Sequence, residues 1–294
     1  MLFSIIIPTY NRASFIATTI QSVLNQTHPH FEIIVVDDGS TDNTEEVVKK
    51  IKDKRINYYQ KKNEERAAAR NYGISKAKGD YITFLDSDDI LLPNHLDEAK
   101  KIFEKETNVE WLHLGYKMVT IENKLLYKIK KFKGNINSNL FQGNFISCNG
   151  IFIRKDIAIE NLFNKIRALS ASEDHELWLR LASQYQLKFS NNITSVIINH
   201  EYRSVLNINK DVLIERQKVF LDLILSNHSL KKFITGYEYK LKSNSYSYIA
   251  LHLALTGKYK KTSLVYLLKA IQTNYLIIFN KRFFAIIKHI LLTH

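Results

Sequence analysis

The sequence of residues 79–89 is Gly79-Asp80-Tyr81-Ile82-Thr83-Phe84-Leu85-Asp86-Ser87-Asp88-Asp89, in which three aspartates follow a short apolar run. We expect residues 81–85 to form a buried strand, with the acids just beyond its carboxyl end. Three carboxylates within four residues repel one another unless positive charge lies among them, and oxygen clusters bind hard divalent cations. The stretch therefore predicts either a metal site at a strand end or a solvated acidic turn before a helix that begins near Pro93, capped by Asp89 or Asn94.

Strands and helices alternate along the first 90 residues. Pro8 is expected to end the first strand, because proline cannot donate to a strand ladder. The alternation is typical of a mostly parallel α/β sheet that is buried on both faces. Apolar runs predict strands at 2–7, 31–36 and 56–59, and apolar residues at helical spacing predict helices at 13–25, 44–51 and 67–76.

Polar residues follow three of these strands, at 9–12, 37–38 and 86–89. Ligands of open α/β sheets bind beyond the carboxyl ends of the strands, so we expect these residues to line one rim around a nucleotide. The sequence lacks the phosphate-binding patterns G-x-G-x-x-G and G-x-x-x-x-G-K-[ST]. A divalent ion on the acidic cluster could hold a diphosphate instead. Asp37 and Asp38 fit a base contact, a second metal or a structural turn.

A second acidic motif, Glu173-Asp174, lies in the stretch 170–181. Leu177, Trp178 and Leu181 predict a helix whose first turn contains both acids, where exposed backbone N–H groups favour a carboxylate. Asp174 is therefore either a helix cap or a functional acid. Further elements are predicted elsewhere: a helix at 94–103, strands at 111–116, 145–153 and 194–199, a surface strand and turn at 124–133, and helices at 212–225, 237–255, 260–273 and 275–292.

The chain has 294 residues, 45% of them hydrophobic, and a formal net charge of +13. Residues 205–294 hold 14 Lys or Arg against 4 Asp or Glu, so the positive charge is concentrated in the C-terminal helices. Such a region can contact nucleic acid or an anionic membrane surface, or can pack as a bundle with solvated lysines. The acidic rim argues against nucleic acid, since it would repel a phosphate backbone.

The sequence favours a soluble or peripheral protein in a reducing compartment. No run of about 18 apolar residues marks a spanning helix, and residues 1–4 lack the basic start of a secretion signal. The single Cys148 excludes an intramolecular disulfide and is expected in the core. We therefore expect a cytoplasmic location that allows peripheral contact with the inner face of the cytoplasmic membrane through residues 205–294.

Four motifs resemble those of family 2 inverting glycosyltransferases with the GT-A fold. In chain order they are Ser4-Ile5-Ile6-Ile7-Pro8-Thr9-Tyr10-Asn11-Arg12, Val35-Val36-Asp37-Asp38-Gly39-Ser40-Thr41-Asp42, Ala69-Arg70-Asn71-Tyr72-Gly73-Ile74 and Phe84-Leu85-Asp86-Ser87-Asp88-Asp89. The resemblance implies a GT-A Rossmann-like sheet, a nucleotide-sugar donor, usually a UDP-sugar, and Asp86-Ser87-Asp88 as the D-x-D metal motif. The sequence departs from the family at Glu64-Glu65-Arg66, where a small residue or glycine is frequent.

The resemblance also implies roles for single residues. Asp88 would be the main ligand of a Mn2+ or Mg2+ ion, and Asp86 would lie near the ribose. His200 follows the last predicted strand, and either His200 or Arg203 could contact the diphosphate or the metal, or be an ordinary loop residue. Arg70 could meet the nucleobase or form a salt bridge with Glu64 or Glu65. The predicted nucleotide-sugar site comprises Pro8, Thr9, Tyr10, Arg12, Asp38, Arg70, Asp86, Ser87 and Arg203, and the predicted metal ligands are Asp88, Asp86 and His200.

Glu173-Asp174 matches the E-D motif of the family, whose aspartate is the usual catalytic base. In an inverting transfer an acceptor hydroxyl attacks the anomeric carbon opposite the leaving nucleoside diphosphate, and one carboxylate takes the proton. A cation stabilises the charge that grows on the diphosphate. Asp174 is therefore predicted as the general base, with Glu173 beside it in the catalytic site.

Two domains are predicted: a catalytic domain at 1–204, with a nucleotide-sugar half at about 1–92 and an acceptor half at about 93–204, and a basic helical domain at 205–294. The predicted activity is transfer of a hexosyl or N-acetylhexosaminyl group to a glycan or lipid-linked glycan in bacterial capsule, lipopolysaccharide or exopolysaccharide synthesis. The alternative is a non-catalytic basic protein that binds nucleic acid or membrane. The sequence carries no signal for the oligomeric state.

Overall fold

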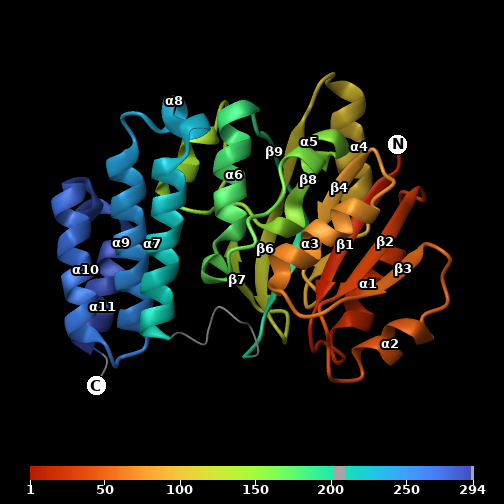
Figure 1. Ribbon diagram of the computed structural model, residues 1–294, viewed down its shortest axis with the longest axis horizontal. Helices are drawn as coiled ribbons and strands as arrows, with labels where there is room; N and C mark the ends of the chain where they lie inside the picture. The colour runs from red at the N-terminus through yellow and green to blue at the C-terminus, as the bar shows by residue number, and fades with distance from the viewer. Residues whose placement is uncertain (202–208, 293–294) are drawn as a thin grey trace. The chain divides into compact units, whose positions relative to one another are not determined.

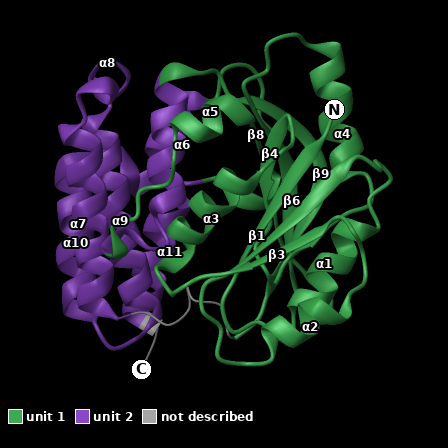
Figure 2. Ribbon diagram, turned by 45° about the vertical axis from the view of Figure 1, so that its right-hand side comes forward, with its two compact units in different colours: residues 1–136, 145–167, 184–201 green, residues 137–144, 168–183, 202–294 purple. Residues whose placement is uncertain are grey.

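The computed structural model describes residues 1–201 and 209–292 (Figure 1). The chain divides into two compact units, which Figure 2 colours separately. The sheet unit comprises residues 1–136, 145–167 and 184–201, and the helical unit comprises residues 137–144, 168–183 and 202–294. The helical unit thus includes two segments that precede the expected domain boundary near residue 204.

The sheet unit is built on nine strands: β1 (Phe3–Thr9), β2 (Phe31–Asp37), β3 (Ile56–Gln60), β4 (Tyr81–Phe84), β5 (Ile90–Leu91), β6 (Trp111–Thr120), β7 (Leu125–Lys128), β8 (Ile151–Arg154) and β9 (Lys188–Asn199). Their order is β3-β2-β1-β4-β8-β6-β9-β5, with β7 paired to β6. Strands β1 to β4 are parallel, β8 is antiparallel to both β4 and β6, and β6 is parallel to β9. The predicted α/β class is confirmed, and the sheet has a parallel half followed by a mixed half.

Helices cover both faces of this sheet: α1 (Ile16–Leu24), α2 (Thr44–Lys50), α3 (Glu65–Lys76), α4 (His95–Lys105) and α5 (Lys155–Glu160). Side chains alternate between the faces along a strand, so Phe3, Ile5 and Ile7 of β1 join a core with α1, α2 and α4. Ile6 points to the other face, where a Cβ on Gly73 of α3 would lie 2.4 Å from Ile6 Cγ2. The predicted order of elements over the first 90 residues is confirmed, and β1 lies buried along its whole length.

The expected end of the first strand at Pro8 is wrong, because β1 continues through Pro8 to Thr9. Thr9 accepts a ladder hydrogen bond from Asp38 on the β2 side, so the neighbouring Pro8 nitrogen faces the β4 side. Pairing with β4 ends at Ile6, opposite Phe84. The missing N–H of proline therefore removes no ladder bond.

The buried strand expected at 145–153 is also wrong in part, because β8 begins only at Ile151. Residues Cys148–Gly150 form a 3-10 turn, η2. The backbone N–H of Ser147 donates to His113 Nε2 at 3.1 Å, so this bond goes to a side chain. A Cβ on Gly150 would lie 2.4 Å from the Leu114 carbonyl oxygen. Glycine at this position allows the turn to approach β6 closely.

The helical unit contains α6 (Glu173–Gln184), α7 (Lys210–Ser226), α8 (Lys231–Ile234), α9 (Glu238–Leu255), α10 (Lys260–Thr273) and α11 (Lys281–Leu292), with 3-10 turns η1 (Asn137–Gln142), η3 (Arg167–Leu169), η4 (His228–Leu230) and η5 (Tyr275–Phe279) at or between them. Helix α9 contacts α7, α10 and α11, and the four run alongside one another (Figure 1). Ala250, Ala254, Leu267 and Ile286 form one core among α9, α10 and α11.

The single helix expected at 275–292 is wrong, since η5 and α11 are separated at Asn280. The Asn280 side chain accepts a hydrogen bond from the backbone N–H of Arg282 at 3.0 Å, which starts a new helix. Among the described helices, none has both the length and the apolar content needed to cross a membrane.

Candidate functional site

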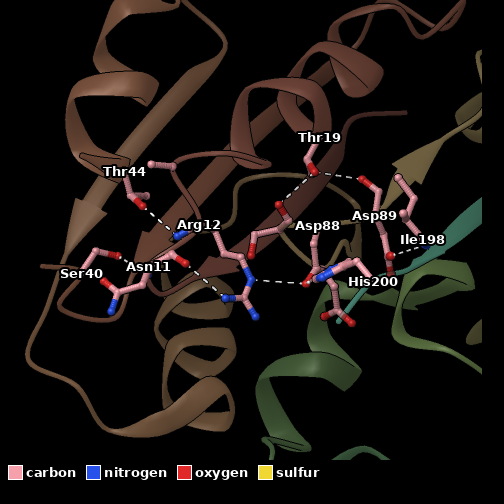
Figure 3. A network of polar contacts seen from close by, with 12 residues as sticks. Asn11, Arg12, Thr19, Ser40, Thr44, Asp88, Asp89, Ile198 and His200 are labelled. Carbon is pink, nitrogen blue, oxygen red and sulfur yellow. Dashed lines mark hydrogen bonds and ion pairs between the residues drawn. The ribbon is translucent and has the colours of Figure 1, made fainter. Parts of the chain in front are cut away.

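Asp88 lies where segments that follow three different strands meet. Arg12 Nε donates to Asp88 Oδ2 at 3.3 Å, and His200 Nε2 lies 3.2 Å from the same oxygen (Figure 3). Phe15 stacks on the His200 ring, with the centroids 4.5 Å apart. The structure thus brings together Arg12 after β1, Asp88 after β4 and His200 after β9, as the rim position of these residues predicts.

The loop after β1 fixes the backbone of Arg12. Asn11 has a positive φ of 50°, a left-handed conformation that asparagine tolerates well. Its backbone N–H donates to Ser40 Oγ at 2.9 Å, and its side-chain oxygen accepts from the Thr41 backbone N–H at 2.8 Å. The backbone N–H of Arg12 donates to Thr44 Oγ1 at 2.9 Å (Figure 3). The segment after β2 therefore holds the loop that aims Arg12 at Asp88.

Asp89 has a structural role that differs from its neighbour's. It is 0% exposed, and its carboxylate accepts from Asn149 Nδ2 at 2.6 Å and from the Ile198 backbone N–H at 2.9 Å. The expectation that Asp89 or Asn94 caps the following helix is wrong, since Asn94 makes no side-chain cap bond to α4 and Asp89 faces inward. Asp89 instead ties the end of β4 to β9 and to η2.

Asp86 pairs with a buried arginine. Arg70 is 2% exposed, and its Nη2 donates to Asp86 Oδ1 at 2.9 Å. The guanidinium lies 5.2 Å from the centre of the Phe163 ring, within the range of a cation–π contact. Arg70 thus forms an ion pair with Asp86, which the sequence analysis had not named as its partner. Of the two suggested acids, Glu64 pairs with Lys61 and Glu65 with Arg167.

Asp37 occupies the structural turn that was one of its expected roles. It is fully buried, and it accepts from Tyr58 Oη and from the Ser40 backbone N–H, each at 2.7 Å. Burial, together with the hydrogen bond to Asp37, raises the pKa of Tyr58 far above its ordinary value. Tyr58 is therefore a fixed hydrogen-bond donor.

Asp38 lies beside a lysine that the sequence analysis did not single out. Its Oδ1 accepts from Lys61 Nζ at 2.8 Å and from the Glu64 backbone N–H at 3.1 Å. Burial lowers the pKa of Lys61, but its hydrogen bonds to Asp38 and Glu64 outweigh this effect and raise it. The Thr9 carbonyl accepts from the backbone N–H of Asp38, and the buried Thr9 hydroxyl has no hydrogen-bond partner in the described part of the chain.

The other residues predicted to bind the nucleotide-sugar differ in their exposure to solvent. Tyr10 is 45% exposed, and Pro8 is buried within β1. Ser87 is buried, and its carbonyl accepts from Thr19 Oγ1 at 3.0 Å. Arg203 lies outside the described residues.

The predicted metal ligands are gathered only in part. Within residues 1–201 and 209–292, no three His, Cys, Asp or Glu side chains form a group that could hold an ion. Asp88 and His200 do lie together, and their 3.2 Å separation suits neighbouring ligands of an octahedral ion, which lie about 3 Å apart for bonds of about 2.1 Å. These two residues fit a Mg2+ or Mn2+ ion that takes its other ligands from a diphosphate and water. Asp86 is turned toward Arg70.

Asp174 is the second residue of helix α6 in the helical unit, directly after Glu173. Asn144 Nδ2 donates to Asp174 Oδ2 at 2.8 Å, and the His175 backbone N–H donates to Asp174 Oδ1 at 2.7 Å. Ala171, just before the helix, has a positive φ of 70°, an unusual backbone for a residue with a Cβ. Glu173 is 2% exposed. The predicted place of both acids in a first helical turn is confirmed.

Three residues that hold these carboxylates, Lys61, Asn144 and Asn149, were not singled out from the sequence. Asn149 is a polar residue in the middle of an apolar run, and that interruption was a usable signal. Lys61 and Asn144 are polar residues in loops, where no local pattern distinguishes them.

The sequence profile described as "Glycosyl transferase family 2" matches residues 4–163, which is more than half of the chain. The chain belongs to glycosyl transferase family 2. The four motifs quoted above fall inside the matched range, and the family resemblance is confirmed.

Relatives in the same family come from several bacteria. The chain is 40% identical over 211 residues to an "Uncharacterized glycosyltransferase" of Rickettsia bellii, in a match that covers 70% of this chain and 30% of the relative. It is 31% identical over 212 residues to an "Uncharacterized glycosyltransferase" of Haemophilus influenzae, covering 71% of this chain and 80% of the relative. A "Putative teichuronic acid biosynthesis glycosyltransferase TuaG" of Bacillus subtilis is 32% identical over 184 residues, covering 61% and 71% of the two chains.

Solved structures support the same fold. S. aureus TarS 1-349 superposes with a TM-score of 0.67 at 20% identity, covering 93% of this chain and 81% of that one. The mannosyltransferase PcManGT of Pyrobaculum calidifontis superposes with a TM-score of 0.60 at 15% identity, covering 99% and 85%. The similarity extends over the C-terminal helices as well as the family 2 region.

Proposed function

We propose that this chain is an inverting glycosyltransferase that moves a sugar from a UDP-sugar to an acceptor hydroxyl in bacterial surface-polysaccharide synthesis. The observation that carries the proposal is the Asp88 carboxylate held by Arg12 and His200 at the carboxyl rim of the sheet, in a family 2 chain. Nucleotide ligands bind at this rim in open α/β sheets. The transferred group is proposed to be hexosyl or N-acetylhexosaminyl.

Complexes of a structural neighbour support the choice of donor. TarS 1-349 has been crystallised in complex with UDP-GlcNAc and in complex with UDP. The Bacillus relative is named for teichuronic acid biosynthesis, which supports a glycan or lipid-linked glycan as acceptor.

The nucleobase is proposed to bind where the first two strands end. Asp38 and the adjacent Thr9 hydroxyl offer an acceptor and a donor, and the Thr9 hydroxyl has no partner in the described residues. Tyr10 is exposed enough to stack on a base. Arg70 would act through its ion pair, by fixing Asp86 near the ribose.

The diphosphate is proposed to bind beside Asp88. A Mn2+ or Mg2+ ion on Asp88 and His200, when bound, would supply Lewis-acid stabilisation of the leaving diphosphate. PcManGT was solved with GDP-Man and Mn2+, which supports this choice of ion. Arg12 brings a permanent positive charge to the same place and can move from Asp88 to a phosphate oxygen.

Asp174 is proposed to take the proton of the acceptor hydroxyl. The acceptor oxygen then bonds to the anomeric carbon as the bond to the diphosphate breaks on the opposite side, so the anomeric configuration inverts. Asn144 holds one carboxylate oxygen of Asp174, and orients it for this role. A single base suffices for inversion, whereas retention would require a carboxylate nucleophile.

The test is donor turnover by the full chain. UDP-glucose, UDP-galactose, UDP-GlcNAc and UDP-GalNAc would be screened by thermal shift with Mn2+ or Mg2+, because a bound donor stabilises the folded state. We expect at least one donor to raise the melting temperature and to release UDP, and EDTA to abolish the release. An NMR spectrum of the product should show the anomer opposite to that of the donor. If no nucleotide-sugar binds or turns over, the chain is the non-catalytic alternative.

A membrane surface is proposed as a further partner of the helical unit. Tyr275, Phe279, Phe284 and Leu291 are each more than 60% exposed, and Lys281 and Lys288 are exposed among them. Exposed aromatic and aliphatic side chains beside lysines are typical of helices that lie on anionic lipid. This would place the protein in the cytoplasm, at the inner face of the cytoplasmic membrane.

Liposome flotation tests this partner. We expect the full chain to bind phosphatidylglycerol vesicles in a salt-dependent manner, and Phe279→Ser with Phe284→Ser to weaken the binding. Ile121→Ser is the matched control, since Ile121 is 66% exposed in the sheet unit. Equal loss in both variants would remove the helical unit from this role.

A further inference from the structure

A polar cavity of about 260 Å³ lies within the helical unit. Side chains from η1, α9 and α11 and from the turns before α11 line it, and two of them, Lys240 and Arg282, are cations. Gln142, Asn244 and Asn280 contribute amide groups. No acidic residue of the described chain lines this cavity, so its walls are positive and rich in hydrogen-bond donors.

Arg282 is held in place by neutral groups alone. Its Nη1 donates to Asn244 Oδ1 at 2.6 Å and to Ser247 Oγ at 3.1 Å. No described carboxylate forms an ion pair with it, and Tyr248 is the titratable group that acts on its pKa. Burial lowers the pKa of Arg282, which reflects the cost of removing a guanidinium from water. A partly buried cation without a counter-ion gains most from an anionic ligand.

A second arginine of the helical unit, Arg216, also forms no ion pair with a described carboxylate. Arg216 Nε, on α7, is buried and has no hydrogen-bond partner among the described residues. Burial raises the pKa of Tyr248, while Arg216 lowers it, Asp174 raises it and Arg282 lowers it. Arg216, Arg282 and the candidate base Asp174 therefore all act electrostatically on one tyrosine of α9, so the three charged groups belong to one region of the helical unit.

A short loop joins the cavity to the candidate base. Gln142 lines the cavity, and Asn144 donates to Asp174 Oδ2. Gly143 between them has a φ of +134°, and a Cβ there would lie 3.2 Å from Asn244 Oδ1. Glycine thus allows the loop to pass against α9. A ligand in the cavity would lie two residues along the chain from the side chain that holds Asp174.

We propose that this cavity is an acceptor subsite for an oxyanion, the carboxylate or phosphate group of an acidic acceptor sugar, which positions the attacking hydroxyl for Asp174. The inference rests on the proposed transfer reaction and specifies the class of its acceptor. The planar fork of Arg282 suits a carboxylate or phosphate, and Lys240 adds a second positive charge. The cavity is smaller than the roughly 300–1,000 Å³ that holds drug-sized ligands, which suits one sugar residue.

Binding can be measured without donor or turnover. Methyl β-glucuronide, glucose 6-phosphate and the neutral methyl β-glucoside would be titrated into the full chain and followed by NMR or calorimetry. We expect binding of at least one charged sugar, weakened by salt, and at least tenfold weaker binding of the glucoside. A charge-assisted hydrogen bond accounts for a difference of about this size. A preference between the two charged sugars identifies carboxylate or phosphate as the source of the anion.

Variants assign the binding to this cavity. Arg282→Gln and Lys240→Gln should each weaken binding of the charged sugar at least tenfold, while Lys232→Gln, an exposed lysine of α8, should leave it unchanged. Lys240→Gln keeps the test decisive if Arg282→Gln fails to fold. Equal binding of glucoside and glucuronide, or unchanged binding in the cavity variants, overturns the proposal. Charged-sugar binding without any donor turnover would support the subsite and count against the transfer reaction alone.

Discussion

The sheet unit and the helical unit differ in whether their functional charged side chains are paired with an opposite charge. At the rim of the sheet, Asp86, Asp88 and Asp38 each meet a cationic side chain, through Arg70, Arg12 and Lys61 respectively. In the helical unit, Arg282 and Arg216 have no described carboxylate within ion-pair distance, and neutral groups hold the former. One region is balanced without a ligand, and the other carries surplus positive charge.

This difference in pairing affects how each region can bind a charged ligand. Charge pairs at the sheet rim can be exchanged, since Arg12 can leave Asp88 for a phosphate oxygen while a metal ion takes its place. In the helical unit, Arg282 and Arg216 form no ion pair with a described carboxylate, so an anion that reaches them gains the attraction without first breaking such a pair. We therefore expect the rim to control the donor and the helical unit to control the acceptor.

The largest effect is expected from Asp174→Asn, which removes the proposed base while keeping its shape and its contact with Asn144. Loss of a general base typically costs between about 10²- and 10⁴-fold in rate. We expect kcat for transfer to fall about 10³-fold, with the donor-induced thermal shift unchanged. Asp211→Asn, at an exposed first-turn acid of α7, is the matched control. A variant that keeps full transfer activity would show that another group accepts the proton.

A smaller loss of activity is expected from Asp88→Asn, which changes a carboxylate at the charge-paired rim of the sheet. The amide cannot pair with Arg12 or serve as a charged metal ligand, so both donor affinity and kcat should fall, together by about 10²-fold. The metal concentration needed for half-maximal activity should rise. Asp156→Asn breaks an exposed pair with Arg154 and should change neither value. Unaltered metal dependence in Asp88→Asn would exclude this carboxylate as a ligand.

The sequence predicts the parallel half of the fold well because each of its strands is apolar and each is followed by polar residues at one rim. It predicts less where a long-range contact decides the local structure. The residues around Ser147 give no signal in the sequence that its backbone N–H donates to His113. This contact takes the place of a ladder hydrogen bond in the expected strand. Asp88 and Asp89 are chemically identical neighbours, and only the positions of Asn149 and Ile198 distinguish them.

Asp89→Ala separates the roles of Asp88 and Asp89 at the rim, because it should lower the stability of the fold and should not act on the transfer reaction directly. The variant leaves the Asn149 amide and the Ile198 N–H without their buried acceptor. Buried groups left unsatisfied cost about 1–3 kcal/mol each, and we expect the free energy of unfolding to fall by about 2 kcal/mol or more. Urea denaturation with Asp88→Ala as the control measures it. Similar losses in both variants would mean that the two aspartates share one structural role.

At neutral pH the last effect is absent, because it concerns the titration of a histidine in the helical unit. His175 is buried on α6, donates to the Leu140 carbonyl at 2.8 Å and stacks on Phe220. Burial, with a contribution from Arg282, lowers the pKa of His175 to about 4. Because this lies below the ordinary value, the unfolded chain takes up the proton first. Stability is therefore complete above about pH 6.5 and falls by up to about 1.4 kcal/mol per pH unit as the pH drops toward 4.

His175→Gln isolates this contribution, because glutamine can donate to the same carbonyl and does not titrate. Carboxylates also titrate below pH 5, but they do so equally in the two proteins, so the difference between the unfolding curves reports the histidine alone. We expect the variant to lose less stability between pH 6.5 and pH 4.5 than the unmodified chain, and His30→Gln, at an exposed histidine, to lose as much as the unmodified chain. If His175→Gln follows the same curve as His30→Gln, the imidazole binds its proton equally well in the folded and unfolded chains, and the helical unit tolerates one more positive charge beside Arg282.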